Sequence, residues 1–366
     1  MVDAETATAL FSQSYAEARG KFLTVAGAAG LGVDSLAHPL MGRDGEPLAL
    51  DFVIDGAPDS GRQLIISSGC HGVEGFCGSA VQTMLMGDDA FRSACQAAQV
   101  SVLYLHALNP WGFSWWRRTT HENIDLNRNF LDFSQPLPAN PGYDELAPLL
   151  IPPHWPAASA NQAAIGQYIM TRGLPTLQAA VSGGQYAHPD GLFYGGDGPS
   201  WSNQQLRTVL RKLVSDRQRV AWIDLHTGLG PCGVGERILA APDDPTTLAR
   251  TRRWWGAGVT SIGEGNSSSA PLEGLMFQAV VQECPAVEYT GIALEFGTVP
   301  LLALLDALRA DQWLQNHADS AGPELTSTIK QQLRDAFYVD SVDWKRQVLT
   351  QAAEAAQQAV IGLAEV

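Results

Sequence analysis

The sequence predicts an α/β protein with a mixed, mainly parallel sheet and helices on both faces. Short apolar runs typical of buried strands alternate with longer helical stretches along the chain. Two of these runs, residues 64–66 and 221–225, are almost continuously apolar, as expected for strands that are covered on both faces. The chain has 366 residues, of which 45% are hydrophobic, enough to bury one large core. We therefore expect a single domain over residues 1–366, with long loops.

The individual elements follow from these local patterns. Strands are expected at residues 48–54, 63–67, 100–105, 220–225, 237–240 and 291–295. Helices are expected at residues 6–24, 78–86, 160–172, 203–216 and 246–256, and in a helical C-terminal part at about 325–366. Proline is dense in residues 135–156 and disfavours both helix and central strand there, so we expect a long surface loop. The glycine-rich stretch at residues 183–196 is expected to be irregular.

Charge and cysteine content indicate the classes of partner and the compartment. The net charge of −15 disfavours nucleic acid and anionic membrane surfaces as partners. The five cysteines are odd in number and irregularly spaced, which favours free thiols in a reducing compartment. Residues 1–20 lack a basic segment followed by an apolar one, and no apolar run is as long as a membrane span. We expect a cytoplasmic protein, and the sequence carries no signal for its oligomeric state.

Three metal-ligand side chains follow the two most apolar strands. His71 and Glu74 are three residues apart behind the first strand, in a glycine-flanked segment, and His226 ends the second strand. Ligand sites in open α/β sheets lie at the carboxyl ends of strands. Two histidines and one glutamate form a known three-ligand set for catalytic zinc. The alternatives are a helix-capping histidine in a surface turn and a core histidine bonded to the backbone. Asp224, two residues before His226, is a candidate for orienting its ring.

A short loop gathers cationic and amide side chains. Within residues 117–130, Arg118, Asn127 and Arg128 could together bind a terminal carboxylate and polarise a nearby carbonyl. The alternative is a structural salt bridge in which Arg128 pairs with Asp125 or Asp132.

The order of these motifs resembles a known family. The motif of His71 and Glu74, then Arg118 ahead of the Asp-Leu-Asn-Arg-Asn-Phe run at residues 125–130, resembles zinc carboxypeptidases of the M14 type. The Asp-Leu-His-Thr run at 224–227 and the Leu-Glu-Phe-Gly run at 294–297 follow in the same order. The stretch at 183–196 resembles a bacterial, DUF2817-like branch of that clan, related also to the succinylglutamate desuccinylase and aspartoacylase group. The matches span about residues 67–300.

The resemblance implies a zinc carboxypeptidase-like catalytic domain and a role for each matching residue. It implies a zinc ion with three protein ligands: His71, Glu74 and His226. It further implies that Arg118 stabilises the oxyanion, that Asn127 and Arg128 hold the substrate carboxylate, and that Glu295 is the general base. Glu295 follows the apolar run at residues 292–294, where desolvation would raise its pKa towards working pH. The alternative for Glu295 is a surface carboxylate at a strand end.

The predicted function is a zinc-dependent hydrolase that cleaves an amide bond next to a free carboxylate. The first candidate is a metallocarboxypeptidase-like peptidase acting on small peptides, and the second is an N-acyl amino acid deacylase with the same centre. A non-catalytic carboxylate-binding protein is disfavoured because every residue with a chemical role is present. One departure concerns the mobile-loop tyrosine of the family: residues 256–288 contain no tyrosine, so Tyr186 or Tyr194 would have to replace it.

Overall fold

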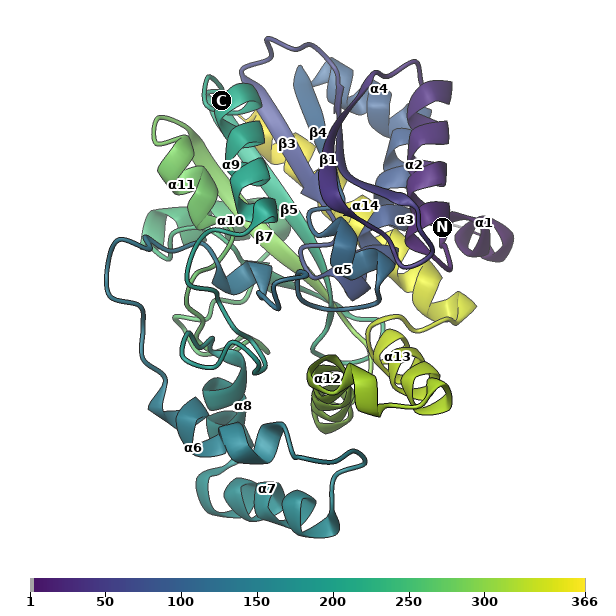
Figure 1. Cartoon of the computed structure of the whole chain (residues 1–366). Coiled ribbons are helices and arrows are strands. Elements are labelled where there is room, and N and C mark those ends of the chain that lie inside the picture. Colours follow the sequence, from purple (N-terminus) through teal and green to yellow (C-terminus); the bar gives the residue numbers. More distant parts are fainter. Residues whose placement is uncertain (1–2, 366) are drawn as a thin grey trace.

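The computed structural model describes residues 3–365, and in this range seven strands form one sheet (Figure 1). The strands are β1 (Val33–Met41), β2 (Pro47–Asp55), β3 (Arg62–Ser67), β4 (Val100–His106), β5 (Arg219–Gly228), β6 (Gly235–Leu239) and β7 (Glu288–Gly297). Their order in the sheet is β1-β2-β4-β3-β5-β7-β6. Neighbours among β4, β3, β5 and β7 pair in parallel, whereas β2 and β6 run antiparallel to their neighbours. The predicted mixed, mainly parallel sheet is confirmed.

Helices cover both faces of this sheet, as predicted, with α9 in front and α14 behind in Figure 1. The N-terminal half contains α1 (Ala4–Leu10), α2 (Tyr15–Ala28), α3 (Gly75–Met86), α4 (Asp89–Ala97), α5 (Pro110–Ser114), α6 (Pro141–Leu150), α7 (Ser159–Arg172) and α8 (Leu174–Ser182). The C-terminal half contains α9 (Trp201–Leu213), α10 (Pro245–Trp255), α11 (Gln278–Glu283), α12 (Leu301–Asn316), α13 (Pro323–Phe337) and α14 (Val342–Ala364). Buried alanines along α14 let this helix pack closely against β3 and β5.

Two predictions of local structure, one of a helix and one of a loop, were wrong in detail, and both departures have a local cause. The single helix expected at residues 6–24 is two helices, because Ser14 caps a new one. The Ser14 hydroxyl accepts a hydrogen bond from the Glu17 amide at 3.1 Å, and the Glu17 carboxylate accepts one from the Gln13 amide at 2.8 Å. The arrangement resembles a capping box, except that the carboxylate binds the amide of Gln13, one residue before the cap, and the Ser-x-x-Glu spacing was readable in the sequence.

The proline-dense segment also departs from its prediction, because it contains helix α6. Asn140 caps this helix through its side chain, and Pro141 occupies the first helical turn, where a missing amide hydrogen costs nothing. Pro148 lies inside the helix, which ends two residues later at Leu150. Strand β1 was not predicted either; it is an edge strand with mostly exposed side chains and therefore lacks an apolar run.

The parallel strands end towards the helices α6, α7, α8, α12 and α13, which lie below the sheet in Figure 1. Side chains from these helices form an apolar cluster distinct from the main core around the sheet, and it includes Leu177, Leu304 and Phe337. No helix within residues 3–365 is long and apolar enough to cross a membrane. All five cysteines are free, as predicted, and only Cys232 is exposed.

Candidate metal centre

The turn after β3 carries the first two candidate ligands. His71 precedes the short 3₁₀ helix η1 (Gly72–Glu74), which leads directly into α3, and its side chain makes no capping hydrogen bond to that helix. Gly72 allows the turn to lie against α5, because a side chain there would fall 2.1 Å from the backbone carbon of Gly112. The amide of Gly72 donates a hydrogen bond to the carbonyl of Arg118 at 3.1 Å. The turn therefore holds the Arg118 loop next to His71 and Glu74.

The third candidate ligand comes from β5 and meets the other two. The ligand atoms of His71, Glu74 and His226 all lie within 4.8 Å of one another, and all three side chains are buried. Nδ1 of His71 lies 2.9 Å from Oε1 of Glu74, and Nδ1 of His226 lies 3.1 Å from Oε2 of the same carboxylate. Two imidazole nitrogens and one carboxylate thus converge at a single point, as the sequence predicted.

Each imidazole is oriented by a second carboxylate through its outer nitrogen. Nε2 of His226 lies 2.5 Å from Oδ2 of Asp224, the aspartate that the sequence offers as a partner for this ring. Nε2 of His71 lies 3.2 Å from Oδ1 of Asp125. Metal-bound histidines commonly have such a partner, because it fixes the ring and strengthens the inner nitrogen as a donor. The residues present therefore fit a divalent cation such as zinc.

Ionised states within the centre depend on these contacts. Burial disfavours the protonated form of His226, but the charges of Asp224 and Glu74 outweigh this effect and hold its pKa well above the usual value. Burial likewise opposes ionisation of Asp125, but Arg118 and His71 hold the pKa of its carboxyl well below the usual range. The pKa of the Glu74 carboxyl is lowered for the same reason, because His71, His226 and Arg118 outweigh its burial.

Arg118 connects two of these carboxylates. Its Nη1 donates to Oε1 of Glu74 at 2.8 Å, and its Nε donates to Oδ2 of Asp125 at 2.9 Å. Nη2 lies 2.8 Å from Nε2 of His71. Guanidinium groups have five N–H donors, so hydrogens remain that can face the cavity Arg118 lines. The structure thus brings Arg118 to the predicted metal ligands.

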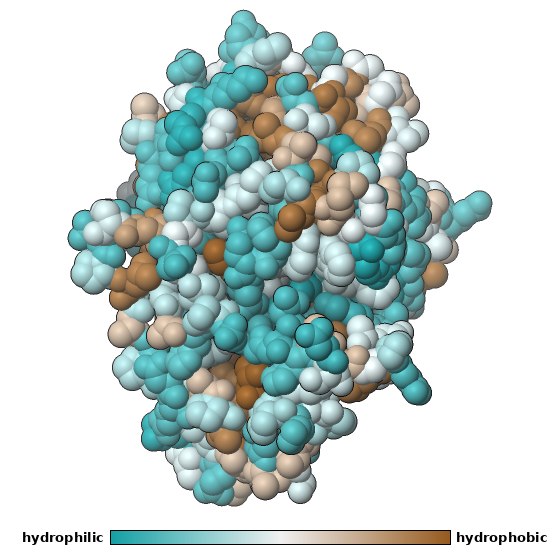
Figure 2. Space-filling view, in the orientation of Figure 1, coloured by the Kyte–Doolittle hydropathy of each residue, from teal (hydrophilic) through white to brown (hydrophobic). Residues whose placement is uncertain are grey.

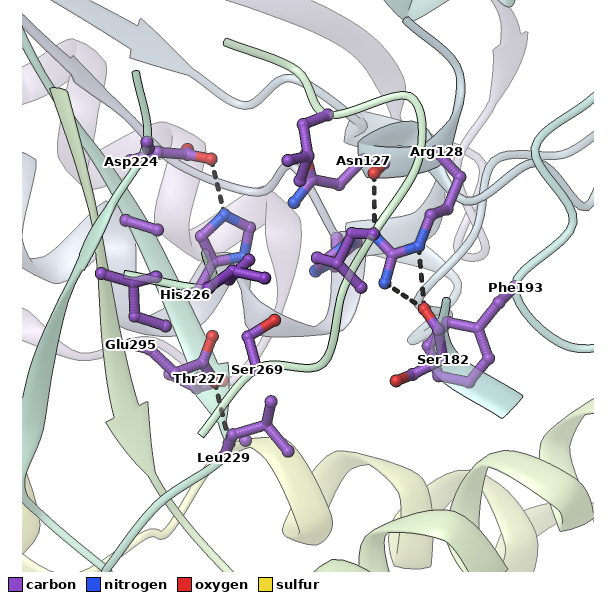
Figure 3. A pocket seen from close by; sticks show the side chains of 18 of the residues that line it. Asn127, Arg128, Ser182, Phe193, Asp224, His226, Thr227, Leu229, Ser269 and Glu295 are labelled. Carbon is purple, nitrogen blue, oxygen red and sulfur yellow. Dashed lines mark hydrogen bonds and ion pairs between the residues drawn. The ribbon is translucent and has the colours of Figure 1, made fainter. Parts of the chain in front are cut away.

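Asn127 and Arg128 lie across the cavity from His226 and Glu295 (Figure 3). Arg128 donates through Nε and Nη2 to the carbonyl of Ser182, at 3.0 and 2.6 Å, and through Nη1 to the carbonyl of Asn127 at 2.8 Å. These acceptors are neutral, and Arg118 rather than Arg128 pairs with Asp125, so the structural salt bridge left open above is not formed. Arg128 lines the cavity, where its positive charge suits a carboxylate.

Glu295 stands beside His226 at the end of β7. The two residues are register partners in the parallel β5–β7 pair, so their side chains project to the same side of the sheet. Oε1 of Glu295 accepts a hydrogen bond from the Leu229 amide at 2.8 Å. Burial, reinforced by the negative charge of Glu74, raises the pKa of Glu295 to about 7. The raised pKa agrees with the desolvation expected from the apolar run before Glu295. The alternative, a surface carboxylate at a strand end, was wrong.

Neither tyrosine suggested as a substitute lines this cavity. The hydroxyl of Tyr186 donates to the carbonyl of Arg128 at 2.7 Å. The tyrosine that does line the cavity, within the described range, is Tyr289. Its hydroxyl donates a hydrogen bond to the carbonyl of Ala240 at 2.7 Å. A mobile tyrosine therefore has no counterpart among the residues that line the cavity.

Sequence reasoning missed two contributors to the site. Asp125 was considered only as a partner of Arg128, although its place two residues before Asn127 was visible. The Phe193 ring lies under both guanidinium groups, 5.1 Å from Arg118 and 5.7 Å from Arg128. Phe193 belongs to the irregular glycine-rich stretch, and no local pattern signals where such a segment folds back.

These features define an α/β protein with a buried two-histidine, one-glutamate centre at the carboxyl ends of its strands. A family model described as "Protein of unknown function (DUF2817)" matches residues 11–351, and the chain belongs to this family. No curated protein matches the sequence.

Among solved structures, the chain is similar to bovine thrombin-activatable fibrinolysis inhibitor in complex with tick carboxypeptidase inhibitor. The identity is 11% and the TM-score 0.47, over 96% of this chain and 97% of that chain. It is also similar to a metallo-carboxypeptidase from Burkholderia cenocepacia, at 12% identity and a TM-score of 0.35, over 88% and 67% of the two chains. A succinylglutamate desuccinylase from Silicibacter sp. TM1040 matches at 13% identity and a TM-score of 0.36, over 84% and 65%.

Proposed function

We propose that the protein is a zinc-dependent hydrolase of the M14 carboxypeptidase type, which cleaves an amide bond next to a free carboxylate. One observation carries this proposal: Nδ1 of His71 and Nδ1 of His226 face opposite oxygens of Glu74 in a buried centre. The contacts of Glu74 favour its ionised form despite its burial, so a cation would meet a charged oxygen ligand between two imidazoles. His71, Glu74 and His226 would hold the zinc ion.

The neighbouring side chains suit hydrolysis of an amide. When bound, zinc supplies Lewis acidity and lowers the pKa of water towards about 7. Glu295 would accept a proton from the attacking water and return it to the leaving nitrogen, a task suited to a carboxyl whose pKa is raised by burial. Arg118 stabilises the negative charge that develops on the carbonyl oxygen, and removal of one such donor typically costs about 10²–10³ in kcat.

Asn127 and Arg128 select the substrate. Arg128 is already oriented by the Ser182 carbonyl and lies across the cavity from Glu295 (Figure 3). A carboxylate bound there sets the distance to the scissile amide, so the enzyme acts on terminal residues or on acylated amino acids. Either substrate class fits the clamp, which is why we retain an N-acyl amino acid deacylase as the second candidate.

Metal content and turnover together test the proposal. Purified protein should contain about one zinc per chain by elemental analysis, as expected of a single three-ligand site. Hydrolysis of a panel of short peptides and N-acyl amino acids should be lost on chelation and restored by zinc. Glu295→Gln should retain the metal and lose at least about a hundredfold in kcat.

The matched control is Glu288→Gln, a substitution of the same type at the exposed start of β7, which should keep both zinc and turnover. Near-normal turnover in a zinc-loaded Glu295→Gln variant would rule out the assigned base. Protein that takes up no zinc, or hydrolysis that persists in chelator, would rule out the metal mechanism.

A further inference from the structure

The cavity next to the candidate centre has apolar walls. Apart from tyrosine, all charged or titratable side chains that line it in the described range belong to the centre itself. They are His71, Arg118, Arg128, Asp224, His226 and Glu295. Most of the remaining lining is leucine, isoleucine, valine, methionine or phenylalanine. Nothing outside the centre could pair with a second charge on the substrate. The group that enters beside the scissile amide is therefore uncharged.

One of these walls touches the candidate base. A side-chain carbon built on Gly228 would lie 3.3 Å from the ring of Phe337, 3.4 Å from Leu304 and 3.5 Å from Oε1 of Glu295. The hydrogen bond from the Leu229 amide to Glu295 brings a further apolar side chain to the same place. Figure 3 shows Leu229 and Glu295 on the opposite side of the cavity from Arg128 and Phe193.

This geometry identifies which half of the substrate meets the wall. If the substrate carboxylate lies at Arg128 and the scissile carbonyl lies beside Glu295, the chain continues past Glu295 on its acyl side. The surface there combines side chains of α8, α12 and α13 with that of Leu229, which follows β5. We call it the acyl wall, and its residues are Leu174, Leu177, Leu229, Leu301, Leu304, Leu305, Leu308 and Phe337.

The acyl wall extends to solvent at the mouth of the cavity. Leu302, beside it on α12, also lines the cavity and is 45% exposed. Figure 2 shows hydrophobic side chains within a mostly hydrophilic surface in the lower part of the molecule, where Figure 1 places α6 and α8. Covering apolar surface that is in contact with water by an apolar group lowers the free energy. An elongated apolar substituent would cover it from Glu295 outwards.

We propose that the acyl wall binds an apolar acyl group, so that the preferred substrates are amino acids acylated with a medium or long hydrocarbon chain. This inference rests on the proposed function and specifies its substrate class. An apolar aminoacyl group at the end of a peptide has the same chemistry, and the test below separates the two sources.

A chain-length series measures the preference directly. The zinc-loaded enzyme would be assayed on N-acetyl-, N-hexanoyl- and N-decanoyl-leucine, with N-acetyl-Leu-Leu as the peptide arm. The value of kcat/KM should rise by about fourfold for each of the first added methylenes, which is the expected gain from burying one CH₂. The ratio of the decanoyl to the peptide value identifies the natural source of the group.

A pair of variants on α12 tests the wall. Leu301→Asp puts a charge at the first residue of the helix, where an acidic side chain is favourable for folding. It should lower the decanoyl-to-acetyl ratio of kcat/KM by at least about tenfold. Ala303→Asp is the matched control, since Ala303 is exposed in the same turn and does not line the cavity. It should leave both values unchanged.

Binding gives a readout that does not depend on turnover. Titration calorimetry of the Glu295→Gln variant should show tighter binding of decanoyl-leucine than of acetyl-leucine, and this difference should shrink in the double variant with Leu301→Asp. Equal kcat/KM for all chain lengths, with turnover intact, would overturn this inference alone. Absence of turnover on every substrate by zinc-loaded enzyme would overturn the proposed function and this inference with it.

Discussion

The partly buried position of Glu295 beside Glu74 predicts that this residue destabilises the metal-free protein. Its pKa is about 7 in the fold, against 4.5 for a free side chain, because burial and Glu74 both oppose its ionisation. A group with a raised pKa contributes stability below pH 4.5 that is lost as the pH rises through 7. At about 1.4 kcal/mol per pH unit, the loss at pH 8 amounts to about 3 kcal/mol.

Glu295→Gln removes the charge and keeps an oxygen that can accept the Leu229 amide hydrogen. In chelator, the variant should therefore exceed the native protein in unfolding free energy by up to about 3 kcal/mol at pH 8. At pH 5, where the native carboxyl is mostly protonated, the two proteins should be nearly equal. Urea unfolding at both pH values, followed by circular dichroism, measures the difference.

Glu288→Gln provides the control, since Glu288 is exposed on the same strand and pairs with Arg219 at 3.1 Å. Loss of such a surface pair should change stability by less than about 1 kcal/mol, and in the opposite direction. A Glu295→Gln variant that is no more stable than the native protein at pH 8 would refute the reasoning about burial.

Three further predictions address the centre itself. His71→Ala should reduce zinc content to near zero by elemental analysis, whereas His121→Ala, outside the cluster, should leave it unchanged; equal zinc in both variants would contradict the ligand assignment. Arg128→Ala should raise KM by about a hundredfold or more, because a charge-assisted bidentate contact is lost, and an unchanged KM for carboxylate substrates would exclude the clamp. Hydrolysis should fall on acidification with a limb below pH 7, because Glu295 must be ionised to act and a bound cation lowers its pKa from the metal-free value; activity that does not fall on acidification to about pH 4 would argue against this base.

The sequence predicted the convergence of the candidate ligands because two strong local signals coincide. Strands β3 and β5 each contain a nearly continuous apolar run, at residues 64–66 and 221–225, and parallel neighbours place their carboxyl ends at one edge. His71 follows β3 by four residues and His226 lies within β5, two residues before its end, so little chain remains in which they could diverge. Glu295 was predictable for the same reason, since its own strand is the next neighbour of β5.

The acyl wall and the Arg118 contacts could not be predicted in this way. Whether Arg118 or Arg128 pairs with Asp125 depends on side-chain rotamers within one short loop, and residue spacing does not fix these. The acyl wall joins α8 to α12 across more than a hundred residues of chain, and only tertiary packing determines that Leu177 and Leu304 share a cluster. Amphipathic patterns show that such helices bury a face without showing against what.

Charge balance joins these features into one account of the centre. Four carboxyl groups surround the two histidines: those of Glu74, Asp125, Asp224 and Glu295. Arg118 is shared between Glu74 and Asp125, so a single positive charge serves two carboxylates. Burial, together with the charge of Glu74, keeps Glu295 protonated near neutral pH in the metal-free fold, and a bound dication would favour its ionised form. A centre of this kind carries an electrostatic cost in the metal-free fold, and cation binding relieves that cost at the same carboxylate that the proposed chemistry needs ionised.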